Sequence, residues 1–228
     1  MLLTEENYMI GVIFDFNGTL FDDSDKQEKA WKIFASKIFH RDISQEEFKY
    51  YIHGRNSEFI VQYLSEAALR KDQIRQYVEE KETIYRELCE ADKFHTRLNF
   101  EAELLLYELK ERKIPMTIAT ASTKSNMEYY IKKFQLGKWF EIKNIIYNDG
   151  TIPGKPNPDL YYLAAEAIQV EPRRCIVFED SISGIQAAYN AGVRRIIAVV
   201  PKKQKNQFEK LPGVCDTISS FHSFDRKF

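Results

Sequence analysis

The chain has few cysteines, no long hydrophobic run and almost no net charge, and each of these absences excludes a class of protein. Its three cysteines, Cys89, Cys175 and Cys215, are odd in number and far apart, which argues against a disulfide framework or a zinc site. No apolar run approaches the roughly 18 residues of a membrane span, and the start M-L-L-T-E-E-N-Y lacks the basic residues of a signal peptide. We therefore expect a soluble, cytoplasmic protein with no membrane partner and reduced, mostly buried thiols.

The charge balance and the size narrow the choice further. A formal net charge of -1 gives no electrostatic reason for a nucleic-acid partner, and the basic run at 202–205 is short enough to be a solvated loop. With 228 residues, 44% of them hydrophobic, the chain can bury one substantial core and a modest second unit. The sequence does not decide the oligomeric state, and a monomer is the simplest expectation.

Short apolar runs alternate with helical patterns along most of the chain. The first run, 10–14, stops at a carboxylate. Further strands are expected at 115–120, 142–147, 175–178 and 195–200, with helices at 99–113, 124–136, 158–169 and 182–191. Repeated strand and helix units predict a parallel sheet with right-handed crossovers, which is a doubly wound, Rossmann-like α/β core.

Residues 22–96 have a different pattern, because their apolar residues recur at helical spacing. Trp31, Phe34 and Ile38 mark one helix, and similar patterns follow at 60–67 and 74–88. Ser44 and Glu47 have the spacing of a capping box. The sequence therefore predicts an all-helical insertion, 22–96, in a core made of residues 1–21 and 97–228.

Polar residues follow the ends of the first two predicted strands. They are Asp15, Asn17, Gly18 and Thr19 after the first strand, and Thr120, Ala121 and Ser122 at the end of the second. Ligands of parallel sheets bind beyond the carboxyl ends of the strands, so these groups are candidates for a phosphate site with the N–H groups of the following helix. The alternative is an Asp-Asn-Gly turn and a helix N-cap with no ligand.

Charged residues occur at two later points of the chain, each of which also follows a predicted strand. Three prolines stiffen the loop around Lys155, and a fixed ammonium beside a carboxylate would keep that carboxylate ionised. Glu179 and Asp180 follow an apolar strand, where burial is costly without a cation, and carboxylates with a backbone carbonyl suit Mg²⁺. The alternatives are a proline-rich turn and a helix N-terminus with acids that match its dipole.

Taken in order, these segments resemble the four motifs of the haloacid dehalogenase-like (HAD) superfamily. D-F-N-G-T-L at 15–20 is similar to D-x-D-G-T-L, Thr120 closes the second strand, and G-K-P-N-P-D at 154–159 is similar to the third motif. E-D-S at 179–181 and its continuation S-G-I-Q-A-A-Y-N-A-G resemble the fourth. The helical insertion resembles the small cap of the subclass that contains beta-phosphoglucomutase and many sugar-phosphate phosphatases. The main departure is Asn17, where the family has a second Asp.

The resemblance implies a Mg²⁺-dependent phosphatase that acts on a small phosphorylated metabolite, in particular a sugar phosphate, through an aspartyl-phosphate on Asp15. It implies four metal ligands, namely Asp15, Glu179, Asp180 and the main-chain carbonyl of Asn17. Thr120 and Lys155 would share catalysis with positions 15 and 17, and substrate would contact Gly18, Thr19, Ala121, Ser122 and the cap residue Arg55. Because Asn17 cannot move protons, a loss of about 10²–10⁴ in rate is expected, with recovery in Asn17→Asp.

Three other functions remain open at this point. A sugar phosphomutase resembling beta-phosphoglucomutase would need Arg55 to bind a distal phosphate. A non-catalytic phosphometabolite-binding relative would explain Asn17, as would an engineered substitution that traps a complex. The third function is dehalogenation. This reaction needs no metal, whereas the adjacent acids Glu179 and Asp180 are typical of a metal site, so they disfavour dehalogenation.

Overall fold

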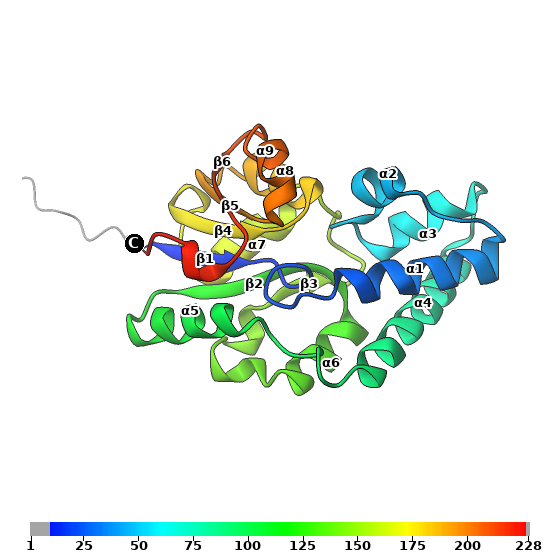
Figure 1. The fold of residues 1–228 in the computed structure, drawn as a ribbon, viewed down its shortest axis with the longest axis horizontal. Coiled ribbons are helices and arrows are strands. Elements are labelled where there is room, and N and C mark those ends of the chain that lie inside the picture. Colours follow the sequence, from blue (N-terminus) through cyan, green and yellow to red (C-terminus); the bar gives the residue numbers. More distant parts are fainter. Residues whose placement is uncertain (1–9, 227–228) are drawn as a thin grey trace, which may run out of the picture.

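Six strands form one parallel sheet in the computed structural model, which describes residues 10–226 (Figure 1). The strand order is β3-β2-β1-β4-β5-β6, and every neighbouring pair is parallel. The strands are β1 (Gly11–Phe14), β2 (Met116–Thr123), β3 (Ile146–Asn148), β4 (Cys175–Glu179), β5 (Arg195–Val199) and β6 (Val214–Ile218). The predicted doubly wound core is confirmed, with the first strand in the middle of the sheet.

Helices cover both faces of this sheet. The core helices are α5 (Phe100–Glu111), α6 (Lys124–Lys133), α7 (Asp159–Ala167), α8 (Ile182–Asn190) and α9 (Lys205–Phe208). Short 3-10 turns are η2 (Leu136–Lys138), η3 (Ile142–Asn144), η4 (Pro172–Arg174), η5 (Lys202–Gln204) and η6 (Phe221–Ser223). Alternate residues of β1 point to opposite faces, so Val12 and Phe14 join one hydrophobic cluster and Ile13 joins another. Both clusters fix the position of Asp15 just beyond β1.

The outer strands differ from the prediction. The expected strand 142–147 is the turn η3 followed by the three residues of β3, and β6 had no counterpart in the prediction. Edge strands are covered less completely than central ones, so they lack a continuous apolar run. In β6, for example, Cys215 and Asp216 are exposed.

Residues 24–91 form a helical unit with its own hydrophobic cluster, which includes Trp31, Phe34, Phe48 and Ile60. Its elements are α1 (Ser24–Phe39), α2 (Gln45–Glu47), the π-helical turn η1 (Phe48–Ile52), α3 (Ser57–Ser65) and α4 (Lys71–Ala91). The predicted capping box between Ser44 and Glu47 is present. No helix between residues 10 and 226 is both long and apolar enough to cross a membrane.

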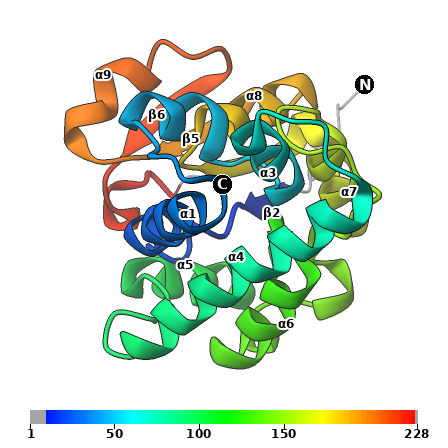
Figure 2. The ribbon, with the colours of Figure 1, turned by 90° about the vertical axis from the view of Figure 1, so that its right-hand side faces the viewer.

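The helical unit contacts the core on two sides. On one side α4 runs next to α6 (Figure 2), where Arg86 Nη1 donates to Asn126 Oδ1 over 2.9 Å. On the other side Ser183 Oγ donates to the carbonyl of His53 over 2.9 Å. The chain at Gly54 has a φ of 72° and lies so close to the core that a Cβ there would be 2.1 Å from Ser181 Oγ. The unit therefore closes over the carboxyl ends of β1 and β4.

Candidate active site

Charged side chains from three separate segments meet beyond β1 and β4. Lys155 Nζ lies 2.6 Å from Asp15 Oδ1 and 2.5 Å from Glu179 Oε1, with the Lys155 side chain fully buried. Asp15, Glu179 and Asp180 each offer a carboxylate oxygen within 4.8 Å of the others. The structure thus brings together the residues that the sequence predicted from the first, third and fourth motifs.

Burial controls the electrostatics of this cluster. It raises the pKa of Asp15 to about 7, although the Lys155 ammonium opposes the shift. Burial and the Glu179 carboxylate hold the pKa of Asp180 well above its ordinary value. Burial opposes the charge of Lys155, yet Asp15 and Glu179 raise the pKa of its ammonium well above the usual value. With all three carboxylates ionised, the single ammonium would leave an excess of negative charge, which a divalent cation would balance.

The donor atoms fit Mg²⁺, which prefers oxygen ligands. The Asp180 carboxylate accepts no hydrogen bond from the residues that the structure describes, and it lies beside Gly18, where a Cβ would be 2.1 Å from Asp180 Oδ2. The carbonyl of Asn17 is not used by the turn, whose backbone hydrogen bonds go to the carbonyls of Phe16 and Phe21. These oxygens and Asp15 are available as direct ligands.

Glu179 is in a different position, because both of its oxygens already have partners. Oε1 accepts from Lys155 and, over 3.2 Å, from Tyr161 OH. Oε2 accepts from the backbone N–H of Ser181 over 2.8 Å and from its hydroxyl over 2.9 Å. A role through water, or in fixing Lys155, therefore suits Glu179 better than direct ligation.

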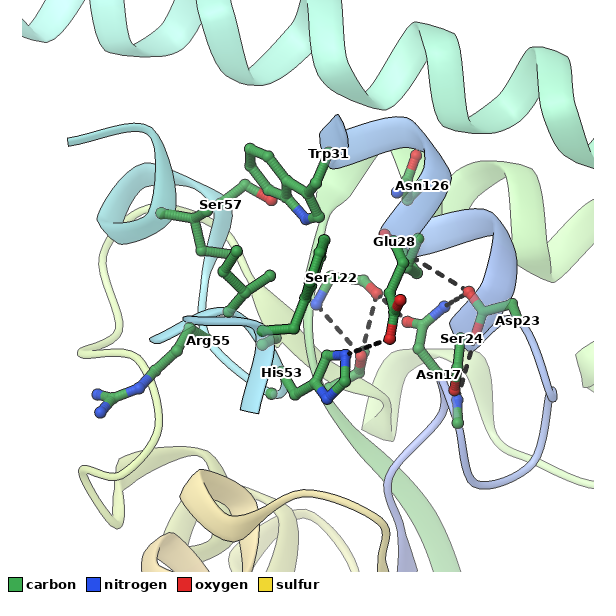
Figure 3. A pocket seen from close by; sticks show the side chains of 18 of the residues that line it. Asn17, Asp23, Ser24, Glu28, Trp31, His53, Arg55, Ser57, Ser122 and Asn126 are labelled. Atoms are coloured by element: carbon green, nitrogen blue, oxygen red, sulfur yellow. Dashed lines mark hydrogen bonds and ion pairs between the residues drawn. The ribbon is translucent and has the colours of Figure 1, made fainter. Parts of the chain in front are cut away.

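Asn17 is half-buried and is held in a polar network (Figure 3). Its Nδ2 donates to Asp23 Oδ2 over 2.7 Å and to Tyr130 OH over 2.9 Å, and its Oδ1 accepts from Ser122 Oγ over 2.5 Å. Tyr85 OH also donates to Asp23 Oδ2, over 2.5 Å. Sequence analysis missed Asp23, which lies at the start of the predicted insertion 22–96 and had only the adjacent pair of acids at 22–23 as a signal.

Most of the predicted phosphate-binding residues line the cavity, but Thr19 does not. Thr120, Ala121 and Ser122 line the same cavity as Asp15 and Gly18, and the Ser122 N–H donates to Thr120 Oγ1 over 3.2 Å. Helix α6 is capped by Thr123, so Ser122 is not its N-cap. Thr19 is not a cavity residue: its hydroxyl is buried and has no hydrogen-bond partner in the part of the chain that the structure describes.

The cavity extends from this cluster into the helical unit and has a volume of about 90 Å³. That is several times the roughly 10–15 Å³ that one water molecule needs. Its far wall carries Lys81, whose Nζ lies 2.7 Å from Gln27 Oε1 and 3.2 Å from both oxygens of Glu82. Glu82 also accepts from Ser57 Oγ and from Asn126 Nδ2. Nothing in the sequence indicated that Lys81 and Glu82 form a pair, because adjacent residues on a helix point in different directions.

Arg55 lines the cavity near its rim. Its Nη1 donates to the carbonyl of Lys155 over 3.1 Å, and its guanidinium carbon lies 4.9 Å from the centre of the Phe59 ring. Figure 3 shows the side chain extending away from Asn17 and Asp23. In this arrangement Arg55 contacts the core loop that carries Lys155, and the interior of the cavity is left to other residues.

Comparisons with known proteins concern the sequence and the fold of the chain. The family model for haloacid dehalogenase-like hydrolases matches residues 12–198. The chain is 29% identical over 199 residues to a phosphorylated carbohydrates phosphatase of Thermotoga maritima. The matched residues make up 84% of this chain and 86% of that protein. A HAD hydrolase of family IA from Entamoeba histolytica is 35% identical, with a TM-score of 0.84 over 96% of both chains. A beta-phosphoglucomutase from Clostridium difficile shares the fold, at 21% identity and a TM-score of 0.78 over 96% of this chain and 94% of that one.

Proposed function

Because the chain belongs to the family of haloacid dehalogenase-like hydrolases, we propose that it is a Mg²⁺-dependent phosphatase of small phosphorylated carbohydrates. One observation carries the proposal: a buried Asp15 carboxylate, paired with Lys155, lines a cavity beside the Asp180 carboxylate, which accepts no hydrogen bond within residues 10–226. The substrate class is supported by the similarity to the phosphatase of Thermotoga maritima.

The proposed reaction has two steps on Asp15. A carboxylate oxygen forms a bond to phosphorus while the bond to the ester oxygen breaks, and that oxygen takes a proton from solvent and leaves as the alcohol. Water then attacks the phosphorus and loses a proton to solvent while the bond from phosphorus to Asp15 breaks, which releases phosphate and the Asp15 carboxylate. Lys155 favours the ionised form of Asp15 against the effect of burial, while the Thr120 and Ser122 hydroxyls and the backbone at Ala121 bind phosphate oxygens.

A bound Mg²⁺ would screen the charge of the transferring phosphoryl group. Asp15, Asp180 and the carbonyl of Asn17 would hold it directly, with Glu179 behind them. We also propose that residues 22–96 act as a cap on a core of residues 1–21 and 97–228. The contacts of α4 with α6 and of His53 with Ser183 support a closed state that shields the cavity from bulk water.

The cap side of the cavity favours a phosphatase over a phosphomutase. A mutase must hold a second phosphate there, which calls for uncompensated positive charge. Lys81 is paired with Glu82, and Arg55 extends toward the core loop instead. A neutral polyhydroxylated group, which can exchange hydrogen bonds with Gln27, Lys81 and Glu82, fits this wall better.

The metal assignment predicts a large loss in Asp180→Asn. This variant keeps the shape but removes the charge of an oxygen ligand, so Mg²⁺-dependent phosphate release should fall by about 10²–10³. Steady-state phosphate release against Mg²⁺ concentration measures the effect, and calorimetry measures Mg²⁺ binding directly. Asp149→Asn is the matched control, because Asp149 is an exposed acid that follows β3, outside the cluster. Equal activity of Asp180→Asn and the parent would contradict the assignment.

The far wall predicts an effect on substrate recognition alone. Lys81→Met combined with Glu82→Gln removes the charge pair without leaving a lone buried charge, and it should raise KM for a sugar phosphate about tenfold, the equivalent of one or two hydrogen bonds. KM for an aryl phosphate should not change, since a small aromatic ring makes no such bonds. Arg55→Ala is the comparison variant: if it has the larger effect on the sugar phosphate, Arg55 and not Lys81 recognises the substrate.

A further inference from the structure

We infer that Asn17 and Asp23 form one functional unit, in which Asp23 is a positioning residue for the Asn17 amide and the site accepts a carboxylate at position 17 or at position 23, but not at both. The inference deepens the proposed phosphatase function and rests on it for its kinetic readout. Its structural basis is the hydrogen-bond network around Asn17, which is independent of any substrate.

The hydrogen bonds of the network fix the orientation of the amide. Both N–H groups of Asn17 Nδ2 are used, one by Asp23 Oδ2 and one by Tyr130 OH. Tyr130 OH donates to Tyr85 OH over 3.0 Å, and Tyr85 OH donates to Asp23 Oδ2, which closes a ring of four groups. The remaining amide atom, Oδ1, accepts from Ser122. An Asn17 amide turned by 180° would place Oδ1 against the Asp23 carboxylate, which only accepts hydrogen bonds, and would lose the bond to Asp23.

Asp23 is surrounded by neutral donors. Besides Asn17 and Tyr85, its carboxylate accepts from the backbone N–H of Gly18 over 3.0 Å and from Gln27 Nε2 over 3.1 Å. The residue is 0% exposed, and none of these donors carries a positive charge. Aspartate at position 17 would therefore bring a second carboxylate to about the same place as the present donor atom, at hydrogen-bond distance from the fully buried Asp23. Such a contact replaces an attraction by a repulsion beside a desolvated carboxylate.

The position of Asp23 shows that its side chain serves this contact and not the helix that it begins. Asp23 occupies the N-cap position of α1, where an aspartate commonly accepts from a backbone N–H of the first turn. Here the side chain makes no capping hydrogen bond and points to Asn17 and Gly18 instead. The helix forgoes the stabilisation that a capping side chain supplies.

This pairing reverses the expectation for Asn17→Asp. The resemblance of the first motif alone predicts that an aspartate at position 17 restores turnover. With Asp23 in contact, Asn17→Asp by itself should lower turnover, because the amide that joins Asp23, Tyr130 and Ser122 is lost. The restoring change is the exchange of both residues, Asn17→Asp with Asp23→Asn, which keeps one amide and one carboxylate in the ring.

The test is a double-mutant cycle of the parent, Asn17→Asp, Asp23→Asn and the exchanged pair. We expect each single change to lower kcat for an aryl phosphate about tenfold or more and to lower the melting temperature, and the exchanged pair to recover both, with a coupling of at least about tenfold. KM should change little, because the pair faces the reacting centre and not the remote part of the substrate. Asp22→Asn is the control partner, since this neighbouring acid is exposed and should not rescue Asn17→Asp.

Several outcomes would overturn the inference. They are additive effects of the two changes, a gain of turnover in Asn17→Asp alone, and equal rescue by Asp22→Asn. If Asn17→Asp does not fold, the exchange is judged in the Asp23→Asn background, where failure to fold again would contradict the inference. If no member of the cycle releases phosphate, the proposed function fails, whereas the coupling in melting temperature still decides whether Asn17 and Asp23 act as a unit.

Discussion

Asp15→Asn is expected to reduce phosphate release by about 10⁶-fold, the scale of the loss when the nucleophile of a hydrolase is removed. The amide has the shape of the carboxylate, so its Oδ1 can still accept from Lys155 Nζ, which lies 2.6 Å away in the parent. It cannot form a stable acyl phosphate. Phosphate release from a sugar phosphate and from an aryl phosphate should fall together, because both reactions pass through the same step.

Two measurements separate this result from simple misfolding. The melting temperature of Asp15→Asn should stay near or above that of the parent, because the change removes one of three crowded carboxylates around Lys155. Parent protein stopped with acid during turnover of a labelled substrate should carry one phosphate on the peptide that contains Asp15, and the variant should carry none. Residual activity of more than about one hundredth would assign the nucleophile to another group.

Lys155→Met is expected to damage both stability and activity. The Lys155 side chain is fully buried between Asp15 and Glu179, and removal of one partner from a buried ion pair costs about 3–5 kcal/mol of unfolding free energy. The same change removes the ammonium that lowers the pKa of Asp15, so more of the nucleophile would be protonated at neutral pH. Urea denaturation measures the first effect, and phosphate release measures the second.

Lys133→Met is the matched control for Lys155→Met. Lys133 also pairs with a glutamate, over 2.7 Å to Glu90 Oε1, but its partner is half exposed, and such surface pairs contribute about 0–1 kcal/mol. Lys133→Met should therefore leave stability and turnover almost unchanged. If Lys155→Met were equally mild, Lys155 would have no part in holding Asp15, and the proposed mechanism would lose its means of ionising the nucleophile.

The sequence by itself determined the four central strands of the sheet and the position of most of the site. Buried parallel strands have continuous apolar runs, so β1, β2, β4 and β5 were visible as patterns. The polar residues that follow β1, β2 and β4 had to meet, because the carboxyl ends of parallel strands lie at one edge of the sheet. This topological reason predicted the proximity of Asp15, Thr120 and Asp180 without any knowledge of side-chain contacts.

Only the tertiary structure decided the contacts between the helical unit and the core. The partners of Asn17 come from three helices: Asp23 immediately precedes α1, Tyr85 lies in α4 and Tyr130 lies in α6. Nothing in their spacing along the chain relates them to Asn17. Lys81 and the direction of Arg55 depend in the same way on how the helical unit packs over the strand ends. Periodicity specifies which face of an element is buried, whereas the partner of a buried polar group depends on how separate elements are packed in three dimensions.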